Sequence, residues 1–368
     1  MASSSRLIRL LGLLGALTLA VGCVSEDPAA EDNDEMGESS EAIVAPDTSS
    51  RTNALERGEL VLTIDEMPNY GKEEAIARAL RESNVTATIF IVGERLGSVR
   101  PRDGSVYGAI ESVQNIDSLL QNGHLLANHT YSHPIGGAAK APYNPRGCSY
   151  ASMLAGEGCP NGKQQAIREV VWTQQLIIEA VKRAGGADPG RYAGQVRRWF
   201  RPSGGSWNGA GSQSVFSSEL DRLVSTGDTT FSGFEAPIGW NVPVAPRQCG
   251  GAPIIRNGVI ARDQAACRAR EGSLVDWECH ALYRLDASFM PPAKCADNYM
   301  AAVARAGDKG VALFHGNLDT DNYSQALMLS FIAKARAKEV GGKKMRIVHP
   351  DCAIPSTRTA AVSRGLCQ

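Results

Sequence analysis

Two short segments of the chain carry side chains that together could activate water. Two adjacent carboxylates, Asp65 and Glu66, directly follow an apolar run at 60–64. About sixty residues later, two histidines, His129 and His133, stand four positions apart. One carboxylate and two imidazoles form a common ligand set for a catalytic metal that keeps an open position for water. Because the second carboxylate can then act as a base on that water, the pattern predicts a metal-dependent hydrolase.

Alternating strand and helix patterns surround these residues. Apolar β-branched runs predict strands at 60–64, 85–92, 311–314 and 346–348, and amphipathic stretches predict helices at 72–83, 117–121, 169–184 and 325–338. Such alternation is typical of a parallel sheet or barrel, in which chemistry gathers at the carboxyl ends of the strands. His315 directly follows one of these strands, and Arg201 follows a short strand-like run at 197–200, so both are expected at that end.

Composition excludes few function classes. The chain has 368 residues and is 43% hydrophobic, which is enough for one large core or two modest ones. Its net charge of −1 gives no reason to expect a nucleic-acid partner. The charge is unevenly distributed, because residues 24–55 hold nine acidic side chains and one basic side chain. That stretch is also poor in large apolar residues, so it is expected to be a disordered acidic tether.

The N-terminus has the features of an export signal. Arg6 and Arg9 precede an apolar run at 10–21 that is too short for a permanent membrane span, and Cys23 follows it. Small residues before this cysteine resemble a bacterial lipobox, in which the cysteine is lipidated. We expect a signal peptide at 1–23 and an exported lipoprotein of the bacterial envelope, anchored at Cys23, with the outer membrane or cell surface favoured. An ordinary signal peptide cleaved nearby is the alternative.

Eight further cysteines in an exported chain suggest disulfides. Pairing between near neighbours is the favoured arrangement, namely Cys148–Cys159, Cys249–Cys267, Cys279–Cys295 and Cys352–Cys367. Two stretches, 136–165 and 244–297, are expected to be disulfide-braced surface loops inserted into one catalytic domain at 56–350. A C-terminal tail at 351–368 carries the last two cysteines.

Four short motifs follow one another along the body. Residues 63–66 read Thr-Ile-Asp-Glu, residues 129–133 read His-Thr-Tyr-Ser-His, residues 200–202 read Phe-Arg-Pro, and residues 313–315 read Leu-Phe-His. In this order they resemble the polysaccharide deacetylases of the NodB-homology type, carbohydrate esterase family 4. The resemblance implies an α/β fold, a distorted (β/α) barrel, with one divalent metal, usually zinc. It also implies removal of acetyl groups from N-acetylated glycans such as peptidoglycan or chitin.

The resemblance assigns a role to each residue that matches a motif. Asp65 would be the catalytic base, and Arg201 would pair with it and hold it ionised. His315 would be the general acid on the opposite side of the substrate. The metal would be held by Glu66, His129 and His133.

Three departures from the family pattern bear on the activity. Glu66 stands where the family usually has a metal-binding Asp, so its carboxylate reaches further from the main chain. Residues 201–204 lack the aromatic that usually follows in the third motif. The usual Asp-Trp fourth motif is missing after residues 239–241, and Asp276 with Trp277, inside the second cysteine-rich stretch, could supply it.

Two other functions stay open from the sequence. A catalytically weak carbohydrate-binding relative would keep the groove without turnover, and a deacetylase or amidase of a smaller N-acyl substrate would have its groove narrowed by the inserted stretches. Trp207 and Trp240 could line a sugar groove or belong to the core. His124 is expected to support the histidine loop. The sequence does not predict the oligomeric state.

Overall fold

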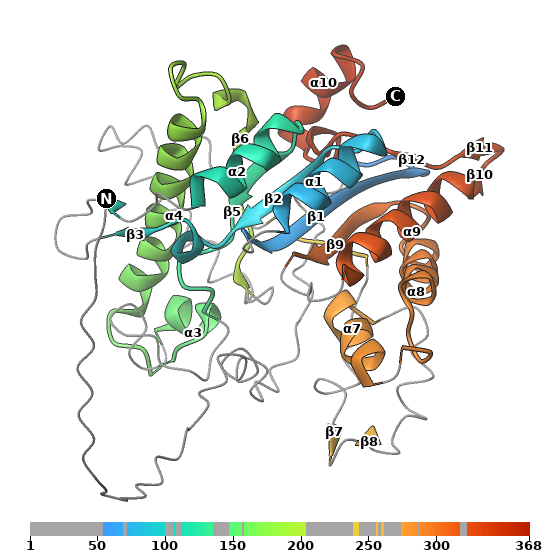
Figure 1. Cartoon of the computed structure of the whole chain (residues 1–368), viewed down its shortest axis with the longest axis horizontal. Coiled ribbons are helices and arrows are strands. Elements are labelled where there is room, and N and C mark those ends of the chain that lie inside the picture. The colour runs from blue at the N-terminus through green and yellow to red at the C-terminus, as the bar shows by residue number, and fades with distance from the viewer. Residues whose placement is uncertain are drawn as a thin grey trace, which may run out of the picture. The chain divides into compact units, whose positions relative to one another are not determined.

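A parallel sheet runs through the middle of the structure (Figure 1). The structure is a computed structural model that describes residues 54–68, 72–99, 106–107, 112–134, 147–156, 158–203, 238–242, 255–256, 259–260, 274–285, 287–316 and 322–368. The strands of the sheet are β1 Glu59–Met67, β2 Ala87–Ile91, β5 Leu125–Asn128, β6 Val196–Phe200, β9 Gly310–His315 and β12 Arg346–Ile347. Neighbours pair in the order β1, β2, β5 and β6, while β9 and the short β12 also pair with β1, all in parallel.

The segment 238–242 closes this sheet into a ring. The N–H of Ile238 donates to the carbonyl of Phe200 at the end of β6, at 2.8 Å. Four residues later, Val242 forms a parallel bridge with Ala312 in β9. Because β9 pairs with β1, these contacts complete the circuit. The fold is therefore α/β, a distorted (β/α) barrel, which confirms the fold class expected from the sequence.

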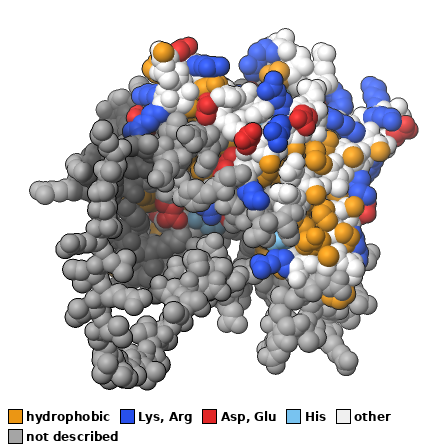
Figure 2. All heavy atoms as spheres, viewed as in Figure 1, with side chains coloured by type: hydrophobic (Ala, Val, Ile, Leu, Met, Phe, Trp, Pro, Cys, Tyr) orange, Lys and Arg blue, Asp and Glu red, His pale blue; other side chains and the backbone are white. Residues whose placement is uncertain are grey.

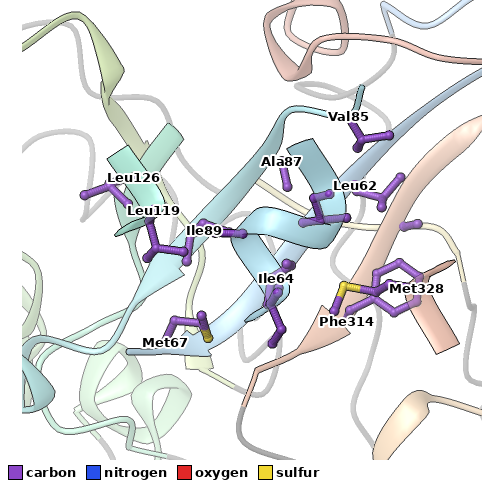
Figure 3. Close-up of a cluster of buried hydrophobic side chains, with 14 of the residues drawn as sticks. Leu62, Ile64, Met67, Val85, Ala87, Ile89, Leu119, Leu126, Phe314 and Met328 are labelled. Atoms are coloured by element: carbon purple, nitrogen blue, oxygen red, sulfur yellow. The ribbon is translucent and has the colours of Figure 1, made fainter. Parts of the chain in front are cut away.

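Side chains of the strands alternate between the outside and the inside of the ring. In β1, Leu62 and Ile64 belong to the outer core, whereas Val61 belongs to a second cluster inside the ring. Fully burying such a side chain stabilises the fold by about 2 kcal/mol. Figure 3 shows part of the outer core, with residues from β1, β2, β5, β9 and the helices, including Leu62, Ile64, Ile89, Leu119, Leu126, Phe314 and Met328.

Helices cover the outer face of the ring (Figure 1). They are α1 Glu73–Glu82, α2 Ser112–Gln121, α4 Gly162–Ala184, α7 Asp276–Leu285, α8 Pro292–Arg305 and α9 Tyr323–Ala337. In α1, Ile76, Ala77 and Leu80 are buried at helical spacing, which is why this segment forms an amphipathic helix. In the part of the chain that the structure describes, no helix is long and apolar enough to cross a membrane.

Short elements complete the description. A further helix, α3 Tyr150–Ala155, packs against α4 through a small apolar cluster. The described residues also form short antiparallel strand pairs and 3₁₀ turns between the larger elements, namely β3 Ser98–Val99 with β4 Val106–Tyr107, β7 Ile255–Arg256 with β8 Val259–Ile260, β10 Glu339–Val340 with β11 Lys343–Lys344, η2 Gly93–Arg95 and η3 Ala193–Gln195.

The C-terminal segment closes the end of the ring at which the strands begin, which we call the floor. It consists of η5 Pro350–Cys352 and α10 Pro355–Ser363, with a disulfide between Cys352 and Cys367. Ala353, Ile354 and Ala361 pack in the interior cluster with side chains from the strands. Residues 351–368, expected as a tail, thus form part of the barrel core.

Three of the four expected disulfides are present, Cys148–Cys159, Cys279–Cys295 and Cys352–Cys367. The fourth expected pair, Cys249 with Cys267, lies outside the described residues. So do Cys23, the expected signal peptide at 1–23, Trp207 and almost all of the expected tether at 24–55.

Both cysteine-rich stretches contain more helix than expected from the sequence. The stretch 136–165 includes α3 and the start of α4, which begins seven residues before the predicted helix. The stretch 244–297 includes α7 and the start of α8. Cys279 and Cys295 are 0% exposed in the outer core, so this disulfide joins two buried helices rather than bracing a surface loop.

Candidate active site

The carboxyl ends of four strands bring the expected site residues together. Asp65 and His315 pair in register at the ends of β1 and β9, His129 directly follows β5, and Arg201 directly follows β6. Adjacent parallel strands end at the same edge of a sheet, so side chains far apart in sequence meet there. Figure 2 shows histidine and acidic side chains near the centre of the face in view.

A β-bulge turns Glu66 into the same site. β1 pairs with β2 regularly up to Ile64, and the register shifts before pairing resumes at Met67. Glu66 lies between them with a φ of 63°, a left-handed conformation that is uncommon for residues with a side chain. Neighbours in a regular strand point to opposite faces. The bulge instead lets the adjacent carboxylates of Asp65 and Glu66 reach one group of histidines.

Arg201 is 0% exposed and fixes the orientation of Asp65. Its Nη1 donates to Asp65 Oδ1 at 2.7 Å and to Thr63 Oγ1 at 2.9 Å. The guanidinium lies over the rings of Phe90 and Trp240, 4.1 and 5.3 Å from their centroids. A buried arginine in this position stabilises a negative charge on the carboxylate beside it. Trp240 is 4% exposed and belongs to the interior core rather than to a sugar groove.

His129 presents a lone pair to Asp65. Its Nδ1 lies 2.8 Å from the carbonyl oxygen of Arg201, so Nδ1 carries the proton and donates to that oxygen. Burial lowers the pKa of His129, although the Asp65 carboxylate and this hydrogen bond act in the opposite direction. The neutral ring therefore turns an unprotonated Nε2 toward Asp65 Oδ2, at 3.5 Å. Two acceptors that face each other at this distance are stabilised when a cation lies between them.

A second imidazole–carboxylate pair lies beside the first. His133 Nε2 is 3.3 Å from Glu66 Oε1, and the rings of His129 and His133 are 5.0 Å apart. Two ligands of one tetrahedral ion with bonds of about 2.1 Å lie about 3.4 Å apart, so His133 and Glu66 have the spacing of ligands that share one ion. Within the described ranges, no three or more His, Cys, Asp or Glu side chains form a complete metal-binding group. The donor types nevertheless fit a divalent cation.

His315 is held by a carboxylate from α7. Its Nδ1 lies 2.7 Å from Asp276 Oδ1, and its main-chain N–H donates to Asp276 Oδ2 at 2.5 Å. Burial alone would lower the pKa of His315, but the carboxylates of Asp276, Glu66 and Asp65 together outweigh it and raise the pKa to about 9. His315 Nε2 points toward the site, 4.0 Å from Glu66 Oε1. The arrangement keeps a proton on His315 at neutral pH.

Residues 130–132, between the two histidines, rest on a buried glutamate from α4. Glu169 accepts hydrogen bonds from the main-chain N–H groups of Tyr131 and Ser132 and from the hydroxyl of Ser132, each at 2.7 Å. Burial raises the pKa of Glu169 to about 7, and the bonds from Ser132 and Tyr131 oppose this shift. This carboxylate has no part in the chemistry expected from the sequence, yet it supports the loop that carries both histidines.

Residues 52–215 match the family model for polysaccharide deacetylases. This segment, which is less than half of the 368 residues, is therefore similar to polysaccharide deacetylases. The matched segment contains five of the six expected site residues, Asp65, Glu66, His129, His133 and Arg201, and His315 lies beyond it.

Curated relatives match parts of the chain. It is 34% identical over 79 residues to a peptidoglycan-N-acetylglucosamine deacetylase from Bacillus cereus, a match that covers 21% of this chain and 24% of the relative. It is 27% identical over 144 residues to a chitooligosaccharide deacetylase from Rhizobium leguminosarum bv. trifolii, covering 39% and 60%. The chain thus matches less than two thirds of the length of either relative.

Solved structures resemble the chain at low sequence identity. A peptidoglycan deacetylase from Bacillus subtilis matches 84% of this chain and 96% of its own, with a TM-score of 0.42 and 16% identity. A carbohydrate esterase of family 4 from Streptococcus mutans matches 80% and 89%, with a TM-score of 0.43 and 16% identity.

The structure brings the six residues expected from the sequence together at one end of the barrel. The sequence named Asp276 only as a candidate and gave no role to Glu169. The signal for Asp276 was its dipeptide with Trp277 inside a stretch expected to be a loop. Glu169 had no signal beyond one acidic residue in a helix. His124 is structural, as expected, since Nε2 donates to Ala77 O at 3.0 Å and Nδ1 accepts from Ala87 N at 3.3 Å.

Proposed function

We propose that this protein is a polysaccharide deacetylase, a metal-dependent hydrolase that removes N-acetyl groups from an N-acetylated glycan. One observation carries the proposal. The neutral His129 turns its unprotonated Nε2 toward Asp65 at 3.5 Å, next to the pair formed by His133 and Glu66 at 3.3 Å. Such a set of facing acceptors is expected to bind a cation.

Glu66, His129 and His133 would hold the divalent cation, for which zinc is our candidate. When bound, such a cation lowers the pKa of a water molecule and polarises the acetamide carbonyl. The hydrogen bond from His129 Nδ1 to the Arg201 carbonyl, at 2.8 Å, fixes the ring so that Nε2 is the ligating atom.

Asp65 takes a proton from the attacking water in this proposal. Arg201 occupies Oδ1 of Asp65, so Oδ2, on the side of the histidines, is the oxygen that accepts the proton. The contact with Arg201 stabilises the ionised carboxylate before the proton arrives. A positioned general base of this kind contributes about 10²- to 10⁴-fold to a rate.

His315 supplies the proton that the departing amine nitrogen needs. Its pKa of about 9 keeps Nε2 protonated at neutral pH, while Asp276 fixes the ring through Nδ1. An amine leaves an acyl carbon readily only when its nitrogen is protonated, so an acid on this side completes the proton transfers.

An N-acetylated glycan is the substrate class we propose, with peptidoglycan as the first candidate polymer. The support comes from the family and from two relatives, one described as a peptidoglycan-N-acetylglucosamine deacetylase and the other as a chitooligosaccharide deacetylase.

We also propose that the chain is exported and anchored through a lipid on Cys23. The basic residues Arg6 and Arg9, the apolar run at 10–21 and the three disulfides support this proposal. Mass spectrometry of the N-terminal peptide from a membrane fraction tests it. A lipid mass on Cys23 is expected, and a free thiol at this position contradicts the anchor.

Acetate release tests the catalytic proposal. The zinc-loaded protein should release acetate from N-acetylglucosamine oligomers, and a chelator or His133→Ala should abolish the release. Thermal unfolding of the variant checks that it is folded at the assay temperature. Absence of release by the zinc-loaded wild type contradicts the proposal.

The same assay separates the alternatives. Binding of the oligomer without any acetate release identifies a carbohydrate-binding relative. Release from N-acetylglucosamine itself but not from its oligomers identifies an enzyme for a smaller N-acyl substrate.

A further inference from the structure

The loop between the two histidines departs from ordinary backbone geometry. Thr130 has a φ of 71° and His133 a φ of 50°, both in the left-handed region. A left-handed conformation costs a residue with a side chain about 1–2 kcal/mol, and more for a β-branched residue such as threonine. This geometry persists only where surrounding contacts hold it in place.

Helix α4 provides the contacts that hold the loop. Glu169 accepts three hydrogen bonds of 2.7 Å from Tyr131 and Ser132 and is 3% exposed. The carbonyl of the next residue in the helix, Val170, accepts a hydrogen bond from Asn128 Nδ2 at 2.9 Å. The loop is thus attached at both ends to one rigid helix of 23 residues.

The opposite side of the loop packs closely against η2, which leaves the loop no space to move in that direction. The N–H groups of Gly93 and Glu94 donate to the carbonyls of Thr130 and Tyr131, each at 2.9 Å. A Cβ atom placed on Gly93 would lie 2.6 Å from Thr173 Oγ1 and 3.0 Å from the Tyr131 ring. The loop lies between η2 and α4, and Glu169 supplies its side-chain hydrogen bonds from α4.

We propose that Glu169 is a positioning residue that sets the affinity of His129 and His133 for a divalent cation by holding the main chain of residues 131–132. This inference rests on the proposed function. Glu169 touches neither imidazole in the contacts above and acts through the loop alone. Residues that orient metal ligands typically change metal affinity by about 10- to 100-fold when they are mutated.

Substitutions at Glu169 distinguish the effect of where its hydrogen-bonding atoms lie from the effect of its negative charge. Glu169→Ala removes all three acceptor contacts, and Glu169→Asp withdraws the carboxylate by one methylene. Glu169→Gln keeps the shape, because its carbonyl oxygen can accept both N–H groups while its amide donates to the rotatable Ser132 hydroxyl. The matched control is Glu179→Ala on the same helix, where the side chain is 38% exposed and pairs with Arg183 at 2.9 Å.

Zinc affinity of the full-length protein is measured by competition with a chelating dye. The absorption spectrum of Co²⁺ bound in place of zinc serves as a second readout, because it reports ligand geometry. We expect about 10- to 100-fold weaker zinc binding and an altered Co²⁺ spectrum for the Ala and Asp variants. The Gln variant and Glu179→Ala should stay within about threefold of the wild type. If Glu169→Ala does not fold, as near-ultraviolet circular dichroism would show, the Asp and Gln variants carry the test.

Two results overturn the inference. One is wild-type affinity in Glu169→Asp with an unchanged Co²⁺ spectrum. The other is a loss in Glu169→Gln as large as that in the Asp variant, because the charge and not the position would then matter. A wild type that binds no divalent cation contradicts the proposed function instead, so the two failures are distinguishable.

Discussion

The two ends of strand β1 each bury a carboxylate, but they treat it differently. At the floor, Glu59 is 1% exposed and accepts hydrogen bonds from two arginines, Arg346 at 3.0 Å and Arg358 at 2.9 Å. At the catalytic end, Asp65 is 2% exposed and has Arg201 at one oxygen, while its other oxygen faces the neutral nitrogen of His129. The floor therefore satisfies its buried charge within the fold, whereas the catalytic end keeps one oxygen of its carboxylate directed at the site.

Backbone conformation differs between the ends in the same way. Near the floor, the left-handed positions are filled by Asn84 and Asp308, residue types that tolerate this conformation through local hydrogen bonds. At the catalytic end they include Glu66, Thr130 and His133, and Glu66 and Thr130 adopt this conformation at a greater cost. Strain of this kind gathers where geometry serves chemistry rather than stability. Changes at the two ends should therefore affect different properties of the protein.

The largest effect is expected for Asp65→Asn, which removes the proposed base and keeps its shape. We expect acetate release to fall by about 10³-fold, or ~4 kcal/mol of barrier. Unfolding by urea shows whether the variant is folded in the assay. Release within tenfold of the wild type would mean that Asp65 is not the base.

Removal of the floor disulfide comes next. The bridge closes a loop with a sequence separation of 15 residues, so Cys352→Ser with Cys367→Ser should lower the free energy of unfolding by about 3 kcal/mol. The rate of acetate release at 25 °C should not change, because the floor lies at the other end of the strands. A slower rate in protein that is fully folded would couple the two ends and contradict the comparison.

Glu59→Gln is the floor counterpart of Asp65→Asn on the same strand. Losing the charge that two arginines share should lower the free energy of unfolding by about 2 kcal/mol without changing the rate. The exposed Glu339→Gln, also near the floor, is the control and should change stability by less than about 0.5 kcal/mol. Equal urea midpoints for Glu59→Gln and the wild type would show that this ion-pair cluster is not stabilising.

The most local effect is a pH dependence at His315. Its pKa is raised from 6.5 to about 9, first by Asp276 and further by Glu66 and Asp65. The protonated ring therefore stabilises the metal-free fold fully below pH 6.5, and this stabilisation is lost as the pH rises through 9. Asp276→Asn should lower the pKa of His315 and flatten the fall in stability across this window. Urea unfolding at a series of pH values, with an NMR titration of the ring, measures both. Identical pH profiles would exclude the pair as their source.

The sequence predicted the catalytic end well because its residues obey simple rules. Asp65 and His315 extend the inward-facing positions of apolar strands, so their place could be read from period-two alternation. His129 and His133 stand in a spacing that is rare by chance next to the other motifs. The bulge at Glu66 was not predicted, because a register shift depends on the partner strand and leaves no local signal.

Asp276, Glu169 and the C-terminal segment 351–368 could not be predicted, because their roles depend on tertiary packing. Asp276 lies in a stretch whose cysteines and polar residues resemble a loop, and the packing of this helix against α8, α9 and β9 is not visible in the sequence. Glu169 is one acidic residue on a long helix, where exposure is the usual expectation. The segment 351–368 was expected as a tail because it has few apolar residues. The sequence does not show that these residues pack inside the barrel.

The central claim is that Glu66 binds the metal whereas the adjacent Asp65 acts as the base. A titration of zinc into the metal-free protein tests it most directly. Calorimetry should find one equivalent of zinc bound by the wild type and by Asp65→Asn, with a loss of about tenfold or more in affinity for Glu66→Gln. Zinc binding lost equally in both variants, or absent from the wild type, would contradict the account.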